Sequence, residues 1–495
     1  MGEEIEAQRF TGADRTRHRE KIRACLAVLG QMLADGRFDA ARPMVGLELE
    51  LNLVDGDERP SLRGADVLAA LDDDAFQTEL GRFNLEVNLP PARLDEGALA
   101  GFEEQIGRRL AQADAAARTL DARVVSIGVL PTLEADDLDA DALSEDARYH
   151  LLSEQILDAR GEDVRIDVAG EERVRLSTST IVPEAACTST QVHLQTSPAQ
   201  FAATWNAAQA ASGVQVALAA NAPFLLGRET WHETRIPLFT QATDTRPDEL
   251  RAQGVRPRVW FGERWITSVF DLFEENLRYF PALLPVVDEE DPAAELAAGR
   301  TPSLAELTLH NGTVYRWNRP VYDVVDGLAH LRVESRVLPA GPSAVDVAAD
   351  AALFLGLVRA LAEQERPVWA ALPFGAARAN LVAAARHGLG ATLAWPDERA
   401  PGLDPHELDV TTLVRERLLP LVEQGLADAG VSRQERDRYL AVLEGRCASG
   451  VNGAVWSLRT VERHEAGGAS RREALRRMLA EYRERQADGA PVHTW

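Results

Sequence analysis

Two acidic, strand-like segments in the first part of the chain carry the residues best suited to chemistry. In residues 46–53, Glu48 and Glu50 alternate with leucines, so a strand would place both carboxylates on one face and the leucines in a core. Residues 83–89 repeat this pattern with Glu86, and Glu79 lies upstream. Proteins bind Mg²⁺ through a few carboxylates together with substrate phosphates, so these acids predict metal-assisted phosphoryl chemistry. The alternative is that each segment is an ordinary half-exposed strand whose glutamates face water.

The composition of the chain disfavours several classes of partner. With 495 residues, 45% of them hydrophobic, the chain can bury one large core or two. A net charge of −25 and the lack of a lysine- and arginine-rich run argue against nucleic acid. The acidic start, residues 1–6, and the lack of a long apolar run argue against a secretion signal and a membrane span. We therefore expect a soluble cytoplasmic protein.

The three cysteines, Cys25, Cys187 and Cys447, lie far apart and form no CxxC pair. This spacing fits a reducing compartment and argues against a zinc or disulfide framework. We expect them to be small buried hydrophobic residues.

Lys21 is the only lysine of the chain, and it lies in a charged helical stretch without neighbouring glycines. A P-loop needs a lysine after a glycine-rich loop, a protein kinase needs one on a strand, and a pyridoxal-phosphate enzyme needs one for its Schiff base. If the protein uses ATP, another architecture must bind it.

The hydrophobic pattern predicts that strands gather before residue 340 and helices after it. The expected helices are 13–35, 97–119, 147–158, 199–220, 345–364, 411–429, 433–443 and 470–486. The expected strands are 46–53, 83–89, 123–131, a pair within 164–178, 188–196 and 331–337. The helix at 13–35 is expected to cover the sheet, and the acidic residues 134–146 are expected to form an exposed loop.

Two of these strands have unusually polar faces. Gln191, His193 and Gln195 share one face of the strand at 188–196. The imidazole could bind a metal or touch a nucleotide, or it could be a structural histidine satisfied within the core. On the later strand, Glu334 lies between two arginines that share its face, Arg332 and Arg336. That pattern indicates either a salt-bridge ladder between strands or a site for an anionic substrate.

Residues 228–235 are dense in charged and aromatic side chains. Arg235 would suit a carboxylate or a phosphate. Alternatively, Glu229, Glu233 and Arg235 could form ion pairs on a surface turn. The His232-Glu233 pair lacks the second histidine of a zincin motif.

In their order along the chain, residues 46–50, 83–91, 189–193 and 334–336 resemble the glutamate-cysteine ligase superfamily. The similarity runs from about residue 42 to 465, and the bacterial carboxylate-amine ligases are the most similar branch. The resemblance implies an α+β fold of the glutamine synthetase type. In that fold an antiparallel sheet curls into a half-barrel with metal-binding acids on its concave face, helices on its convex face and a helical C-terminal region.

The resemblance also implies an organisation of the chain around one catalytic unit. Residues 1–40 would form an N-terminal helix packed on the catalytic domain, residues 41–343 the sheet core, and residues 344–495 the helical part of the same unit. A homodimer is compatible with this organisation.

Matching the chain to the family residue by residue gives a candidate site. The magnesium-binding acids would be Glu48, Glu50, Glu79, Glu86 and Glu334. His193 matches a histidine beside the nucleotide or metal, and Arg336 matches an arginine that faces phosphate. Arg235 and Arg319 resemble further positive groups for the substrate or the nucleotide. Catalysis would then depend on Glu50, Glu86, Arg336 and Arg235, with His193, Arg319 and Arg336 at the nucleotide.

The implied enzyme is an ATP-dependent ligase that forms a C–N bond. It would transfer the ATP γ-phosphate to a carboxylate, for which L-glutamate leads, and couple the acyl group to an amine such as L-cysteine. No protein nucleophile is needed, so Cys187 receives no catalytic role. Two other readings are a non-catalytic regulatory protein that binds nucleotide and amino acid, and a metal-dependent hydrolase that uses the same acids.

Overall fold

A computed structural model describes residues 10–39, 43–396 and 404–495. The acidic start at residues 1–6 and the predicted boundary at residue 40 lie outside these ranges. The division of the chain at residues 40 and 343 stays a prediction.

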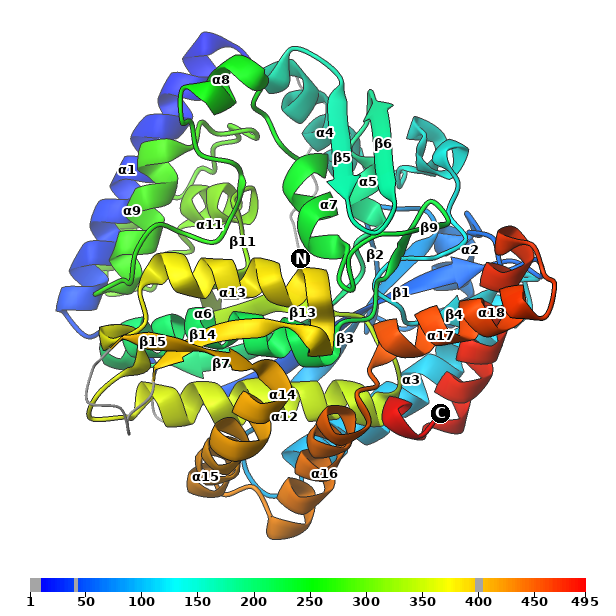
Figure 1. Cartoon of the computed structure of the whole chain (residues 1–495). Coiled ribbons are helices and arrows are strands. Elements are labelled where there is room, and N and C mark those ends of the chain that lie inside the picture. Colours follow the sequence, from blue (N-terminus) through cyan, green and yellow to red (C-terminus); the bar gives the residue numbers. More distant parts are fainter. Residues whose placement is uncertain (1–9, 40–42, 397–403) are drawn as a thin grey trace.

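An antiparallel sheet of seven strands, curled into a half-barrel, lies at the centre of the molecule (Figure 1). Its strands, in spatial order, are β12 (Asn318–Val325), β13 (Leu328–Pro339), β7 (Ser189–Thr196), β1 (Met44–Val54), β3 (Asn84–Arg93) and β2 (Phe76–Thr78). The short strand β4 (Arg123–Val125) pairs with the end of β1. The expected α+β half-barrel is confirmed.

Strand register aligns the polar residues of neighbouring strands across one face of this sheet. Glu50 on β1 lies opposite Glu86 on β3. His193 on β7 lies opposite Glu334 on β13, which in turn lies opposite Arg319 on β12. Because side chains alternate along a strand, these residues share the face that the leucines of β1 do not use.

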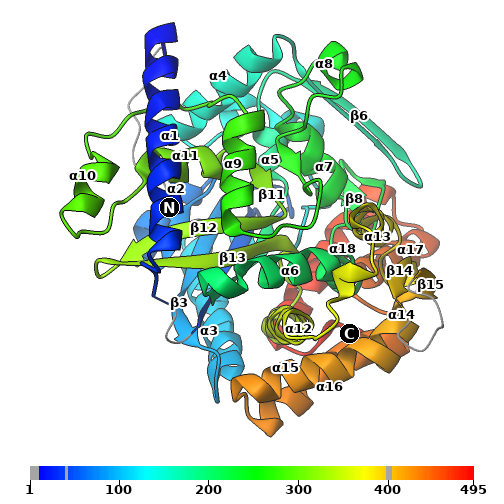
Figure 2. The same cartoon turned by 90° about the vertical axis from the view of Figure 1, so that its left-hand side faces the viewer.

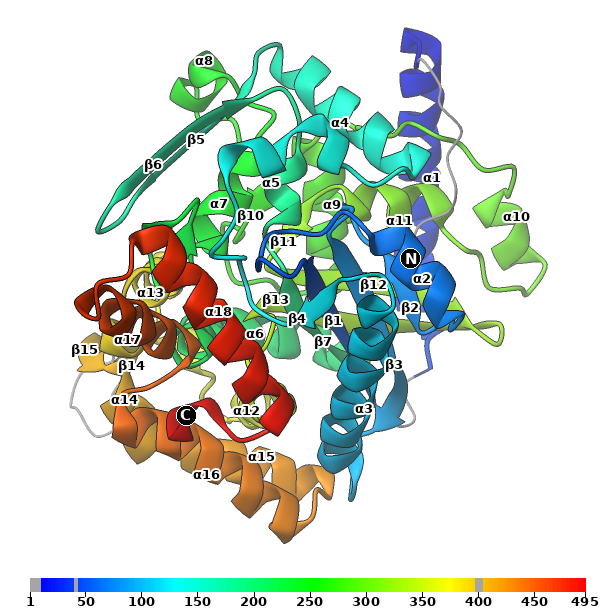
Figure 3. The same ribbon diagram turned by 90° about the vertical axis from the view of Figure 1, so that its right-hand side faces the viewer.

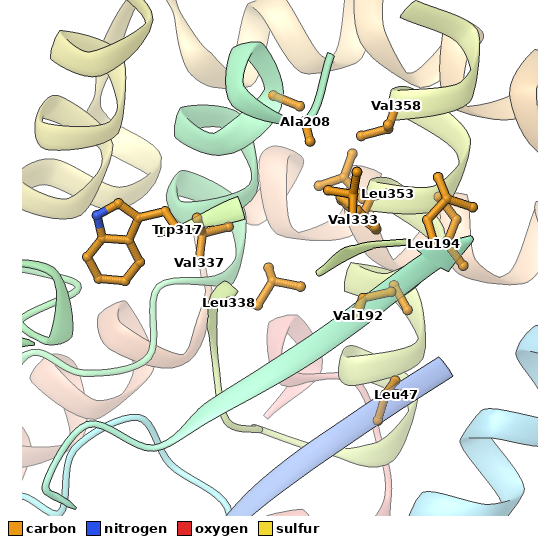
Figure 4. Packing of buried hydrophobic residues seen from close by; sticks show 14 of the residues in the cluster. Leu47, Val192, Leu194, Ala208, Trp317, Val333, Val337, Leu338, Leu353 and Val358 are labelled. Atoms are coloured by element: carbon orange, nitrogen blue, oxygen red, sulfur yellow. The ribbon is translucent and has the colours of Figure 1, made fainter. Parts of the chain in front are cut away.

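The other face of the sheet is apolar and is covered by helices α3 (Ala98–Arg118), α6 (Pro198–Ala219) and α12 (Ala344–Ala362). Leu47, Val192 and Val333 from three strands pack towards Ala208 on α6 and Leu353 on α12 (Figure 4). These five side chains are buried. Ser197 caps α6 by accepting a hydrogen bond from the Gln200 amide, and Pro198 suits the first turn.

Helices dominate the C-terminal part of the chain, as predicted. They include α13 (Phe374–His387), α14 (Val410–Leu413), α15 (Leu419–Ala429), α16 (Arg433–Ser449), α17 (Gly453–Ala466) and α18 (Arg471–Asp488). The buried Arg446 fixes α16 to α12 through ion pairs of 2.8 Å with Asp346 and 2.6 Å with Asp350. Figure 3 shows the C-terminus between α17 and α18 on one side and α16 on the other.

Helix α1 (Gly12–Ala34) packs against a layer of short helices rather than across the sheet (Figure 2). This layer contains α9 (Val269–Tyr279), α10 (Pro292–Ala297) and α11 (Ala305–Gly312). Met32 and Phe38 contact Tyr322 on the edge strand β12. The expectation that this helix covers the sheet is therefore wrong, since its apolar face serves other helices.

Smaller elements complete the fold. The helices are α2 (Gly64–Leu71), α4 (Ala147–Arg160), α5 (Val182–Ala185), α7 (Arg235–Ala242) and α8 (Asp248–Ala252). The strand pairs are β5 (Val164–Ala169) with β6 (Arg173–Thr178), β8 (Phe224–Leu225) with β9 (Arg228–Glu229), β10 (Val259–Trp260) with β11 (Tyr315–Arg316), and β14 (Thr392–Pro396) with β15 (Pro405–Asp409).

Two sequence expectations fail locally. Residues 134–146 are not simply an exposed loop, because they contain two 3₁₀ turns and bury Leu138, Ala142 and Leu143. The strand expected at 123–131 ends at Val125, because only its first three residues pair with β1. No helix in the described parts of the chain is long and apolar enough to cross a membrane.

Candidate active site

Three carboxylates gather on the polar face of the sheet. Glu50 and Glu86 face each other across β1 and β3, and Glu79 follows directly after β2, whose Gln77 lies opposite Glu86. One carboxylate oxygen from each of these three acids lies within 4.8 Å of the others. Register brings Glu50 and Glu86 together, and the turn after β2 adds Glu79.

The electrostatics of this cluster favour a cation. Burial and the charges of Glu50 and Glu86 raise the pKa of Glu79 well above its ordinary value. Burial and the charges of Glu48 and Glu50 raise the pKa of Glu86 to about 7. Burial also raises the pKa of Glu50, although Arg336 and Arg235 oppose this effect. Three carboxylates this close ionise together only beside compensating charge, and oxygen-only donors fit Mg²⁺.

The Glu50 carboxylate is held by strand β7. It accepts hydrogen bonds from the Ser189 amide at 2.7 Å, the Ser189 hydroxyl at 2.9 Å and the Gln191 side-chain amide at 2.9 Å. Such partners fix the orientation of a metal ligand. Gln191 thus gains a role that the polar pattern of its strand only indicated.

Glu48 lies outside this cluster and is paired with His193. The histidine Nε2 lies 3.0 Å from Glu48 Oε1, and Arg332 donates a hydrogen bond of 3.2 Å to Nδ1. Because Nδ1 accepts that bond, a neutral ring carries its proton on Nε2. Burial raises the pKa of Glu48, but His193 outweighs burial and the net effect lowers it. His193 therefore lies between Glu48 and Arg332 on this face.

Glu334 is already neutralised by two arginines. Arg319 donates to both of its oxygens, at 2.9 and 2.6 Å, and Arg336 donates to one at 2.6 Å. Although burial raises the pKa of Glu334, Arg319 and Arg336 hold it well below its ordinary value. Arg332 instead pairs with Asp323 at 2.8 Å. On this strand the structure shows the ion pairs of the first alternative, and Glu334 is not part of the three-acid cluster.

Arg235 is buried at the start of α7. Its guanidinium lies 3.3 Å from Glu233 and donates to the backbone carbonyls of Val337 and Arg336 at 3.3 Å. Gly128 leaves room for it, since a Cβ at that position would lie 3.0 Å from the Arg235 Cδ. The surface-turn alternative is wrong for this pair, because Glu233 is 0% exposed and Arg235 is 3% exposed.

A cavity beside the acids brings in a residue that sequence reasoning missed. It is lined by Glu50, Glu79, Asn84, Glu184, Arg235, Trp317 and Arg336, among others. Glu184, on the one-turn helix α5, has an Oε2 atom that is buried without a hydrogen-bond partner. Burial raises its pKa to about 8, while Arg336 opposes the shift. An isolated glutamate between Pro183 and Ala185 gives no periodic signal that could have identified it.

The cysteines show the expected burial only in part. Cys25 and Cys447 are buried and Cys187 is half-buried. Cys187 lines the same cavity as Glu184, but burial raises the pKa of its thiol. A thiol held neutral in this way is a poor nucleophile.

The comparison with family models decides the relationship that this geometry suggests. Residues 44–481 match the model described as Glutamate-cysteine ligase family 2 (GCS2). This chain belongs to glutamate-cysteine ligase family 2. The match begins with β1, so helix α1 precedes the part that the family model covers.

Solved structures support the fold of this family member. The chain is similar to the glutamate–cysteine ligase (gshA) of Francisella tularensis in complex with AMP, at 12% identity and a TM-score of 0.57, over 91% of this chain and 90% of that one. A bifunctional glutathione synthetase from Pasteurella multocida shows 13% identity over 94% of this chain and 55% of that one, with a TM-score of 0.47. The second score is too low to support an argument. No curated protein matches this sequence.

Proposed function

We propose that this protein is an ATP-dependent carboxylate-amine ligase that activates the γ-carboxylate of L-glutamate and joins it to an amine such as L-cysteine. The observation that carries the proposal is the three-acid cluster beside the buried Arg235 and the partly buried Arg336 in a member of glutamate-cysteine ligase family 2. The AMP bound to the Francisella tularensis enzyme supports nucleotide use by this fold.

In this proposal Glu50, Glu79 and Glu86 hold Mg²⁺ on the polar face of the sheet. Glu48 and Glu334 would join them only if their partners His193, Arg319 and Arg336 turned to the nucleotide instead. When bound, the metal supplies positive charge for the ATP phosphates. The protein contributes fixed ligands, because Ser189 and Gln191 orient the Glu50 carboxylate.

The reaction needs two bond exchanges. A carboxylate oxygen forms a bond to the γ-phosphorus while the bond to ADP breaks, which gives an acyl phosphate. The amine nitrogen then bonds to the acyl carbon, phosphate leaves, and the nitrogen loses a proton. Arg336 and Arg235 stabilise the negative charge of both steps, since guanidinium groups bind carboxylate and phosphate oxygens well. Cys187, with its raised thiol pKa, takes no part.

The compartment, oligomeric state and partners of the enzyme follow from the same proposal. We infer a cytoplasmic protein, where ATP and reduced thiols are available, and a possible homodimer. Its partners would be small amino acids and amines rather than nucleic acid, in keeping with the net charge of −25.

The test measures ADP release by the full chain with Mg²⁺, ATP and L-glutamate, with and without L-cysteine and a panel of other amines. We expect release that requires both glutamate and an amine, and that is lost in Glu50→Gln and after chelation of the metal. Glu444→Gln is the matched control, because that side chain is 58% exposed on α16.

The alternatives give different results in the same assay. Cleavage of a substrate without ATP would favour a metal-dependent hydrolase. Binding of Mg-ATP without turnover in the presence of every amine would favour a regulatory protein and contradict the ligase.

A further inference from the structure

Three buried polar atoms without a hydrogen-bond partner belong to residues that line one cavity beside the acid cluster. They are Nε of Arg235, Oε2 of Glu184 and Oδ1 of Asn84. Buried polar groups in proteins are nearly always paired, so three unpaired atoms around one cavity indicate a ligand with matching groups. Glu50 and Glu79 line the same cavity, which places the ligand next to the proposed metal site.

The unpaired atoms belong to side chains that the fold holds in place. Asn84 donates from Nδ2 to the Asn52 Oδ1 at 3.0 Å, so its own Oδ1 faces away from that bond. Gly81 approaches closely, because a Cβ there would lie 2.3 Å from the Asn84 Oδ1. Helix α5, which carries Glu184, packs against α7, which begins at Arg235.

The unpaired atoms are complementary to a zwitterion. Two acceptors, one of them a carboxylate, can receive the N–H groups of an ammonium. Arg235 on the same cavity offers an unused N–H donor to a carboxylate. A dicarboxylate without an amino group would satisfy the arginine and leave both acceptors unpaired.

We propose that Glu184, together with Asn84, binds the ammonium group of the acyl-donor amino acid while Arg235 binds its α-carboxylate, so that this site selects amino acids over plain dicarboxylates. This inference rests on the proposed function and deepens it. The second carboxylate of the donor then lies towards Glu50 and Glu79, where its activation takes place.

The donor, rather than the acceptor, fits an ammonium site formed by a carboxyl group. The acceptor amine must be neutral to attack the acyl phosphate, and a carboxylate partner would hold it protonated. The ammonium of the donor takes no part in the chemistry and remains charged throughout. Glu184 is therefore a binding residue for the donor.

The test is titration calorimetry of the full chain with Mg²⁺ and ADP present, using L-glutamate and glutarate as ligands. Glutarate matches glutamate except for the amino group. We expect the wild-type protein to bind glutamate at least tenfold more tightly than glutarate, because an ammonium held by a charged acceptor contributes ~10- to 100-fold. In Glu184→Gln, glutamate affinity should fall by that factor while glutarate affinity stays the same.

Other results overturn the inference. Equal affinities of the wild-type protein for glutamate and glutarate would overturn it, and this measurement needs no variant. An equal loss of both ligands in Glu184→Gln would show a structural role, and a changed KM for the amine alone would place Glu184 at the acceptor. Failure of the proposed ligase activity can be told apart from failure of this inference. In that case the protein would bind glutamate selectively but release no ADP.

Discussion

The Glu86 carboxyl makes the stability of the metal-free protein depend on pH. Its pKa is raised from the ordinary value of 4.5 to about 7 by burial and by Glu48 and Glu50. Between these two values the folded state holds a proton that the unfolded state has lost. A rise in pH through this window therefore lowers the free energy of unfolding. Since each tenfold change in proton affinity is ~1.4 kcal/mol, the loss from this group is about 3 kcal/mol.

Urea denaturation with a chelator, near pH 5 and near pH 8, tests this prediction. The wild-type protein should lose about 3 kcal/mol more stability across this interval than Glu86→Gln, which cannot titrate. Added Mg²⁺ should stabilise the wild-type protein more at the higher pH, because the cation binds the ionised carboxylates. An equal loss in both proteins would refute the electrostatic description of the acid cluster.

Three substitutions test other parts of the account. Arg336→Lys should lower kcat at least ~100-fold in the ADP-release assay. Lysine cannot stabilise phosphate and also keep the contacts with Glu334 and Gln191. An unchanged kcat would show that Arg336 has no role in catalysis. Gly128→Ala should reduce kcat/KM roughly tenfold or more by displacing Arg235, whereas unchanged kinetics would show that the arginine tolerates a shift. Arg446→Met should cost about 3–5 kcal/mol in urea denaturation, because Asp346 and Asp350 stay buried without their cation; a cost below about 1 kcal/mol would contradict this.

The local patterns of the sequence predict the strands of the site well. The alternation of Glu48 and Glu50 with leucines depends only on the two-residue repeat of a strand, and β1 follows it. The polar face of β7 and the pattern around Glu334 also depend on this repeat. Helix α3, with its apolar face, and the almost wholly buried α12 fall within a few residues of their predicted limits.

What the sequence could not predict is set by contacts between distant segments. Spacing along the chain does not show that Glu79 joins Glu50 and Glu86, because this requires the pairing of three strands; only the family resemblance pointed to it. The spacing also does not show that two arginines form ion pairs with Glu334. Glu184 was missed because it stands alone on a one-turn helix, and only the folded chain places it beside Arg235.

The most direct test of the central claim follows an oxygen atom through the reaction. The full chain is supplied with Mg²⁺, ATP, an active amine and L-glutamate labelled with ¹⁸O in its γ-carboxylate. If the carboxylate is phosphorylated before the amine attacks, one labelled oxygen appears in the released phosphate for each amide formed. Phosphate that carries no label, while amide is formed, would contradict the acyl phosphate and with it the proposed role of this site.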